Sequence, residues 1–363
     1  MADSKYIIYG RSCPTDYGIY YLHVDIHKDV VYFELWKVFA TTKRVEIIKQ
    51  PLPLRFKSVE LHGIRIAASH PYIFIAIASI EFEHLYFYLL HTEAYTLVPI
   101  VLMGARIPLR INYGLCHVEK GVFFIVGGMN PGGIYCHDSY ALDLANGKCR
   151  KVRQLPCGAD GLSLTALAPG VVGLFGGYGS VHEFSYLQYR MSMNEWTEIP
   201  EQTDILPGRR WKPSLFWIDD NSLLIVGGYS GRNMTDLVVY VPEHHLWIPI
   251  TPELLPLQSR EEGMIVRSKD QRSLIVLGGG TSTHDSIDLS ILQKHIFVAT
   301  QRHLQNQRIN RVEAQVGAQQ DSPKSQEARR DAKSSQVWNL LEEIKRRVRN
   351  AGGDQSLLDL SWA

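Results

Sequence analysis

The sequence has few cysteines, little net charge and no apolar run long enough to cross a bilayer. Its 363 residues include five cysteines, and no two of them form a C-x-x-C pair. An odd number without such a pair is typical of reduced thiols and argues against a disulfide or zinc framework. The formal net charge of +1 gives no general attraction to nucleic acid or acidic surfaces. We therefore expect no bound nucleic acid.

We expect neither a secretory signal nor a transmembrane segment in this sequence. The amino terminus lacks a basic leader followed by a long apolar core, so we expect no secretory signal. The most apolar stretches, residues 72–80 and 95–105, are too short or are interrupted by Pro99, and neither is predicted to span a bilayer. With 45% hydrophobic and 21% charged residues, the chain can bury a full core. We expect an intracellular protein of the cytoplasm, with the nucleus as the alternative.

What the sequence does have is a repeat of about fifty residues. Apolar runs end in paired glycines at Gly127-Gly128, Gly176-Gly177, Gly227-Gly228 and Gly278-Gly279. A tyrosine and a tryptophan seven residues apart follow two of these pairs, as Tyr189 with Trp196 and Tyr240 with Trp247. Two more units lie upstream, one marked by the in-phase Ala78-Ser79 and one, more degenerate, within residues 5–37. Each unit offers about four short strands, which predicts six blades of an all-β propeller.

This pattern resembles the kelch family, whose repeat is a hydrophobic run, Gly-Gly, then Tyr, six residues and Trp. The resemblance covers about four fifths of the chain, and it implies a six-bladed kelch β-propeller over residues 1–299. In that fold we expect the glycine-ended run to form an inner strand, where blades converge and only a bare backbone fits. The Tyr and Trp side chains are expected to pack between neighbouring blades.

The composition changes after residue 300. Residues 300–335 are rich in Gln, Arg, Ala and Ser, which predicts a polar linker that is partly disordered. Apolar residues then recur with helical spacing at Val337, Leu340, Leu341, Ile344 and Val348. This spacing predicts an amphipathic helix within residues 336–363, followed by an apolar docking segment. The fold class is thus a propeller with a C-terminal α-helical extension.

Three arginines recur in phase, seventeen or eighteen residues before the first glycine of a pair: Arg110, Arg210 and Arg260. This places them in the connections between blades, which commonly meet the partner in the kelch family. An exposed guanidinium fork there suits a carboxylate or phosphate on a peptide. The alternative is that the arginines brace the loops against backbone carbonyls. The other candidate contacts are Tyr113, Trp211, Arg232 and Asn233, although core packing is the commoner fate of such aromatic residues.

A histidine also recurs, at His84, His182 and His284, each five residues after the second phased residue of its unit. Three imidazoles on one rim could bind a metal, but a ring spreads equivalent positions apart, so we expect no metal and no cofactor. A few kelch propellers are enzymes, including copper radical oxidases and a sialic acid epimerase, but no catalytic motif is recognisable. The expected function is a non-enzymatic protein-interaction adaptor, with the helix contacting a second partner. The alternatives are an enzyme with a site in the axial funnel and a structural subunit of a larger assembly.

Overall fold

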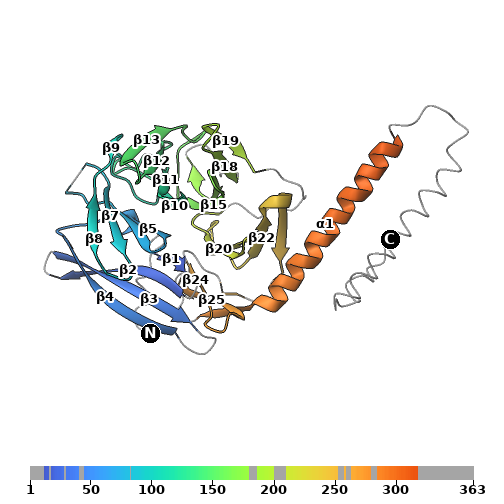
Figure 1. Ribbon diagram of the computed structural model, residues 1–363, viewed down its shortest axis with the longest axis horizontal. Coiled ribbons are helices and arrows are strands. Elements are labelled where there is room, and N and C mark those ends of the chain that lie inside the picture. Colours follow the sequence, from blue (N-terminus) through green and yellow to red (C-terminus); the bar gives the residue numbers. More distant parts are fainter. Residues whose placement is uncertain are drawn as a thin grey trace, which may run out of the picture. The chain divides into compact units, whose positions relative to one another are not determined.

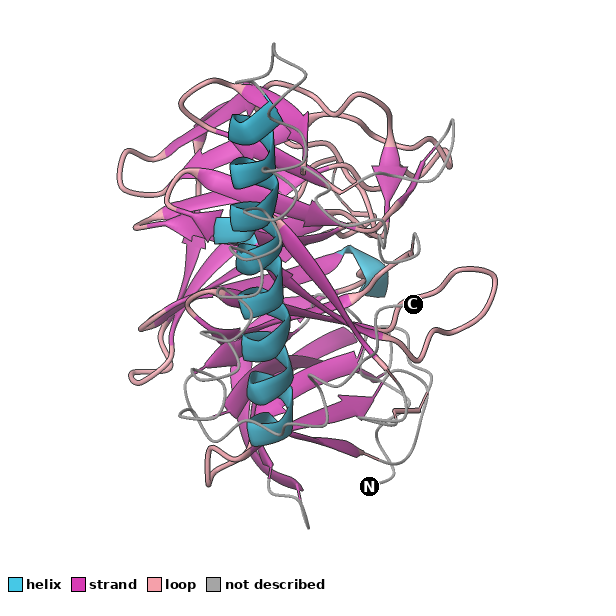
Figure 2. Cartoon of the chain, turned by 90° about the vertical axis from the view of Figure 1, so that its right-hand side faces the viewer, coloured by secondary structure: helices cyan, strands magenta, loops and turns pink. Residues whose placement is uncertain are grey.

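The computed structural model describes ten stretches of the chain, which divides into two compact units, Met1–Ile296 and Phe297–Ala363. The described residues are 12–15, 18–27, 30–40, 45–81, 83–179, 186–199, 210–251, 257–258, 263–278 and 284–317. The first unit contains all the described strands and the second contains most of a long helix (Figures 1 and 2). Each unit is described by itself.

Six sheets of the first unit, antiparallel except where β9 joins the third, stand around a common axis as the blades of a propeller (Figure 1). Blade 1 is β1 (Ser12–Thr15), β2 (Gly18–His27), β3 (Val30–Ala40) and β4 (Val45–Phe56). Blade 2 is β5 (Ile64–Ser69), β6 (Tyr72–Ile77), β7 (Tyr86–His91) and β8 (Leu97–Ile100). Blade 3 is β10 (Gly114–Glu119), β11 (Val122–Val126), β12 (Ser139–Asp143) and β13 (Lys148–Val152), with β9 (Met103–Gly104) outside β13.

The remaining blades follow the same order from the axis outward. Blade 4 is β15 (Ser163–Ala168), β16 (Val171–Phe175), β18 (Leu187–Arg190) and β19 (Glu195–Glu198), and blade 5 is β20 (Ser214–Asp219), β21 (Ser222–Val226), β22 (Leu237–Val241) and β23 (Leu246–Ile250). Blade 6 is β24 (Gly263–Arg267), β25 (Ser273–Gly278) and β26 (Asp285–Asp288). A short pair, β14 (Ala159–Asp160) and β17 (Tyr178–Gly179), lies outside these sheets. The predicted six-bladed all-β fold is confirmed.

The first strand of each blade, and not the glycine-ended run, lies innermost. The strands β1, β5, β10, β15, β20 and β24 are in contact around the ring, and each glycine-ended run is the second strand of its sheet. Burial patterns agree: β10 alternates between buried and half-buried residues, whereas β21 is buried throughout. A strand with a core on both faces reads as a continuous apolar run, and a strand with one face on the channel alternates. The glycine-ended run is therefore an inner strand, as expected, and the first strand of each blade lies one position closer to the axis.

The paired Tyr and Trp side chains pack between blades, as expected. Tyr189 and Trp196 are directly opposite each other in β18 and β19, and both rings contact Phe124 of the preceding blade, with centroids 4.9 and 6.0 Å away. Tyr240 and Trp247 in blade 5 contact Phe175 of blade 4 in the same way, at 6.0 and 6.1 Å. The repeat thus joins each of these blades to its predecessor through an aromatic cluster.

The ring closes where blade 6 meets blade 1. Tyr21 and Trp36 of blade 1 share a buried core with Val266 and Ile275 of blade 6, and Lys269 forms an ion pair with Glu46. Among the described strands, none of blade 1 enters the sheet of blade 6. We call this junction the seam; it is held together by side-chain packing.

A long helix, α1 (Leu289–Gly317), directly follows β26. Asp288 begins it, because its Oδ1 accepts hydrogen bonds from the backbone N–H groups of Ser290 and Ile291, at 2.8 and 3.2 Å, which is the contact of an N-cap. The sequence-based prediction of strands up to residue 299 and a linker from residue 300 is therefore wrong for residues 289–317. The predicted helix within residues 336–363 lies outside the described residues. None of the described helices has both the length and the apolar character needed to cross a bilayer.

Candidate functional site

The glycine pairs turn the chain at one face of the propeller, which we call the glycine-pair face. There each second strand ends and each connection to the next blade arrives. Gly128 has a φ of 94°, a left-handed conformation that favours glycine. A Cβ atom at this position would lie 2.6 Å from the carbonyl oxygen of Ile111, so a side chain does not fit. The expected close approach of bare backbone is confirmed here.

The residue after each of three glycine pairs forms a short ladder with the incoming connection. Met129 exchanges two backbone hydrogen bonds with Ile111, both of 2.9 Å, and Tyr229 exchanges two with Trp211, of 2.8 and 2.9 Å. In blade 4 the same place is taken by Tyr178, which is paired with Asp160 in β14 and β17. A single backbone frame therefore recurs on this face in blades 3, 4 and 5.

The frame presents apolar and aromatic side chains to solvent. Ile134 is 65% exposed, Tyr178 is 56% exposed and Tyr229 is 41% exposed. The ring of Tyr135 stands edge-on to that of Tyr178, with centroids 6.0 Å apart. Arg232 and Asn233, two of the predicted contact residues, are exposed on the loop that follows Tyr229. We call Ile134, Tyr135, Tyr178, Tyr229, Arg232 and Asn233 the rim patch.

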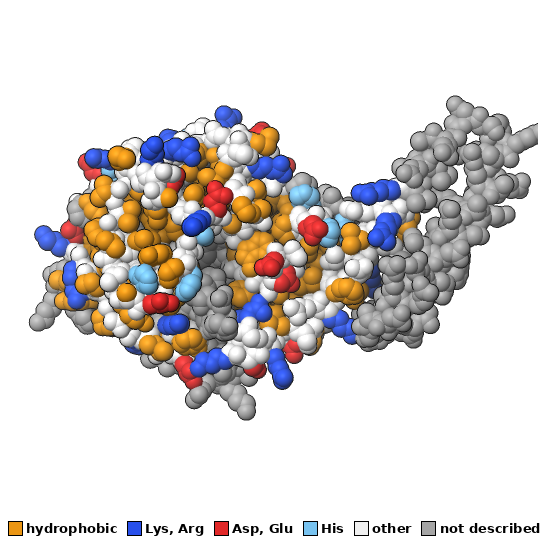
Figure 3. All heavy atoms as spheres, in the orientation of Figure 1, with side chains coloured by type: hydrophobic (Ala, Val, Ile, Leu, Met, Phe, Trp, Pro, Cys, Tyr) orange, Lys and Arg blue, Asp and Glu red, His pale blue; other side chains and the backbone are white. Residues whose placement is uncertain are grey.

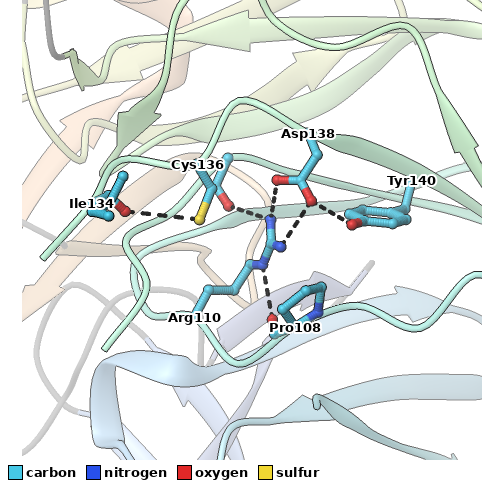
Figure 4. A network of polar contacts seen from close by, with 7 residues as sticks. Pro108, Arg110, Ile134, Cys136, Asp138 and Tyr140 are labelled. Carbon is cyan, nitrogen blue, oxygen red and sulfur yellow. Dashed lines mark hydrogen bonds and ion pairs between the residues drawn. The ribbon is translucent and has the colours of Figure 1, made fainter. Parts of the chain in front are cut away.

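Arg110 is buried under this face instead of exposed on it (Figure 4). Its Nη1 donates to the carbonyl oxygen of Gly127 at 3.1 Å, and its Nη1 and Nη2 donate to the two oxygens of Asp138 at 2.8 and 3.0 Å. Its Nε donates to the carbonyl oxygen of Pro108 at 3.0 Å, and the Tyr140 hydroxyl donates to Asp138. The guanidinium therefore ties the incoming connection to the first glycine of the pair.

This network shifts two pKa values. Burial alone would raise the pKa of Asp138, but the hydrogen bonds and positive charge of Arg110 outweigh it and lower the pKa to about 2. Burial likewise would lower the pKa of Arg110, and the bonded Asp138 carboxylate reverses the direction and raises it. Both groups are thus held in their charged forms as one ion pair.

Arg210 makes the same contacts in blade 5. Its Nη1 donates to the carbonyl oxygen of Gly227 at 3.0 Å, and Nη1 and Nη2 donate to Asp236 at 3.0 and 2.6 Å. Because Arg110 and Arg210 are 1% and 2% exposed, the expectation that these two guanidinium groups face a partner is wrong. The bracing interpretation, left open by the sequence, describes both. Arg260 lies outside the described residues.

The two aromatic neighbours of these arginines have structural contacts as well. Tyr113 is fully buried, and its hydroxyl donates to the carbonyl oxygen of Gly63 at 3.1 Å. Trp211 is half-buried, and its indole N–H donates to Asp160 at 3.1 Å. Asn112 donates to the other oxygen of Asp160 at 3.0 Å, yet burial outweighs both bonds and raises the pKa of this carboxyl. Tyr113 is therefore a core residue, and only the partly exposed Trp211 ring can meet a ligand.

Backbone hydrogen bonds connect successive blades beneath the same face. The backbone N–H of Asn112 donates to the carbonyl oxygen of His62, that of Gly161 to Asn112 and that of Lys212 to Gly161. Each donor–acceptor distance is 2.9 Å. This series fixes blades 2, 3, 4 and 5 relative to one another. The loops of the rim patch therefore stand on a rigid base, which is what recognition by surface loops requires.

A cavity of about 1240 Å³ lies between the first strands of the blades. Leu115, Leu164 and Leu215 are among its apolar wall residues, and the indole N–H of Trp217 donates to the Thr165 hydroxyl at 2.9 Å within it. His117 lines the same wall, and burial lowers its pKa. The space suffices for a small molecule, and an enzyme of the axial-funnel type would have to use this wall.

The recurring histidines do not form a cluster in the part of the chain that the structure describes. His84 precedes β7 in blade 2 and His284 precedes β26 in blade 6, and His182 lies outside the described residues. No group of three or more His, Cys, Asp or Glu side chains able to hold a metal occurs among the described residues. Of the three histidines, the two that are described therefore lie in different blades.

Several functional residues were not singled out by the sequence. Tyr178 and Tyr229 follow the second glycine of a pair directly, and this shared position was a usable signal. Asp138 and Asp236 each stand two residues before an apolar pair of the third strand, a position that is not by itself a functional signal. Their pairing with an arginine 28 and 26 residues earlier needs the folded loop to become visible.

Comparison with known families gives a match to a family of repeat domains. The model of the KLHDC2/KLHL20/DRC7 Kelch-repeats domain matches residues 75–290, which is more than half of the chain and runs from β6 in blade 2 through blade 6. A comparison with curated proteins found no match.

Proposed function

The chain belongs to the kelch-repeat family, and from this premise we propose that it is a non-enzymatic adaptor that binds a segment of a partner protein across the glycine-pair face. Kelch propellers commonly serve as protein-interaction modules. The observation that carries the proposal is the rim patch, where Tyr178 and Tyr229 are 56% and 41% exposed on identical backbone ladders. Exposed tyrosines on a rigid frame are typical anchors of protein interfaces.

The chemistry of the rim patch differs from the arginine forks that the sequence suggested. The exposed aromatic rings and Ile134 offer apolar contact, while Arg232 and Asn233 offer one cation and one amide at the edge. Such a surface suits a partner segment whose apolar side chains are flanked by an acidic or amide group. Trp211 lies next to Tyr229 in the ladder and would extend the apolar contact.

The tail is proposed to contact a second protein, which would make the chain a bridge between two partners. The support is its sequence alone, since the apolar positions within residues 336–363 recur with helical spacing. A role as a subunit of a larger assembly would use the same segment. We place the protein in the cytoplasm.

The test compares affinity capture by the full chain with capture by the triple variant Tyr178→Ala, Tyr229→Ala and Arg232→Ala. We expect the variant to lose specific partners, because each substitution removes an exposed contact and leaves the buried clamps intact. The matched control is Tyr72→Ala, Tyr95→Ala and Lys120→Ala, which removes two exposed tyrosines and a cation from the opposite face. A third arm deletes residues 318–363 and should lose a different subset. Identical captured proteins for wild type and the rim variant would contradict the proposal.

A further inference from the structure

The outer edge of blade 3 brings together two segments that are far apart in the sequence. Strand β9 runs parallel to β13, with Met103 aligned with Lys148 and Gly104 with Cys149. The N–H groups of Met103 and Ala105 donate to the carbonyl oxygens of Gly147 and Cys149, at 2.8 and 2.9 Å. Aligned residues of neighbouring strands share a face, and the period of two adds Arg150 to that face. Met103 therefore lies beside a pair of cations.

The first of these segments is apolar and projects into solvent. Val98 is 52% exposed, Val101 is 89% exposed and Met103 is 65% exposed. Leu102, between the last two, is half-buried and packs against the core shared by blades 2 and 3. Single exposed apolar residues are normal on a protein surface, but three within six residues form a patch.

The second segment is basic. Lys148, Arg150, Lys151 and Arg153 are all exposed, and within the described ranges none of their side chains forms an ion pair. The nearby Asp143 accepts hydrogen bonds from the backbone and side chain of Asn146, at 3.0 and 2.7 Å. The chain as a whole carries a formal net charge of only +1, so this positive charge is local. Figure 3 shows Lys and Arg side chains gathered among hydrophobic ones over β9 and β13.

We propose that this outer strip, formed by Val101, Met103, Lys148 and Arg150, binds the surface of an anionic lipid membrane. Apolar side chains that project outward can enter the boundary between headgroups and acyl chains, while adjacent cations lie at anionic headgroups. An acidic protein segment would be attracted by the same charge. The apolar side chains favour the bilayer, because side chains as exposed as Val101 and Met103 do not line a pocket in which a segment could be enclosed.

The outer strip shares no residue with the rim patch, so the two proposals stand or fall separately. Membrane binding would leave the glycine-pair face to its protein partner.

The test is flotation of the full chain with vesicles of phosphatidylcholine alone or of phosphatidylcholine mixed with phosphatidylserine. We expect flotation with the mixed vesicles only, and a loss of binding as the salt concentration rises. Lys148→Glu with Arg150→Glu should weaken binding by about tenfold or more, because each reversal replaces an attraction by a repulsion. Val101→Asn with Met103→Asn should also weaken it, and both positions are exposed, so folding should be unaffected.

The matched control is Lys57→Glu with Lys120→Glu, which reverses two exposed lysines outside the strip and should leave flotation unchanged. The proposal is wrong if the wild-type chain does not float with the mixed vesicles, or if the control pair lowers flotation as much as the strip pair. Strip-dependent binding of a Glu-rich peptide without flotation would overturn it in favour of an acidic protein segment.

Discussion

Blades 3 and 5 contain the same arginine clamp in two different surroundings. In both, the guanidinium bonds the carbonyl oxygen of the first glycine and both oxygens of an aspartate. The side chain of Asp138 is 14% exposed, and that of Asp236 is 35% exposed. Tyr140 adds a hydroxyl bond in blade 3, whereas blade 5 has Val238 at the equivalent position. The spacing in the sequence determines the contact, but solvent around the carboxylate determines how much the contact stabilises the fold.

Removing the arginine should produce the largest difference in stability between blades 3 and 5. We expect Arg110→Ala to lower the free energy of unfolding by about 3–5 kcal/mol, because Asp138 would remain buried without its cation. Arg210→Ala should cost less, about 1–3 kcal/mol, because water can reach the more exposed Asp236. Urea unfolding of both variants measures the difference. Equal losses would show that the bonds to the glycine carbonyl, which both blades share, carry the stability.

Adding a methyl group at the second glycine of a pair should produce a smaller difference in stability between the two blades. In Gly128→Ala the new Cβ would lie 2.6 Å from the carbonyl oxygen of Ile111 and 2.9 Å from the Cβ of Tyr113. In Gly228→Ala the nearest atom, the carbonyl oxygen of Trp211, is 3.0 Å away. Both residues have positive φ, so both variants carry backbone strain of about 1–3 kcal/mol. Thermal unfolding should rank Gly128→Ala as the less stable, and the reverse order would contradict the packing argument.

Acid should act on the blade 3 clamp by way of Asp138, whose folded-state pKa of about 2 lies below the usual value. A depressed pKa contributes stability that is fully present above about pH 4 and is lost as the pH falls towards 2. The loss from this group is about 2 kcal/mol. Asp138→Asn should remove that part of the acid dependence, as followed by urea unfolding at several pH values. An unchanged pH profile in the variant would show that the pair with Arg110 is not maintained in solution.

The features that repeat with the period of the chain could be predicted from the sequence. The glycine turns, the six blades and the packing of Tyr189 with Trp196 depend on residues close together within one unit. The burial of Arg110 could not be predicted, because it depends on whether the loop that carries Asp138 brings this carboxylate into contact with the guanidinium. The helix α1 was missed because Leu289, Ile291 and Leu292, which directly follow its N-cap Asp288, form a short apolar stretch that is also compatible with a strand. The outer strip was missed because its halves, residues 101–103 and 148–150, meet only through strand pairing.

The seam between blades 1 and 6 has a mechanical consequence. Blades 2 to 5 are linked by covalent connections and by backbone bonds beneath the glycine-pair face, whereas the described contacts of the seam are the packing of Tyr21 and Trp36 against Val266 and Ile275 and the ion pair of Lys269 with Glu46. A thermal fluctuation or a pull on the two ends of the ring can therefore separate blades 1 and 6 without breaking any of the sheets that the described strands form. Opening of the ring between blades 1 and 6 is then a local event, and its free energy is expected to be lower than that of unfolding a blade.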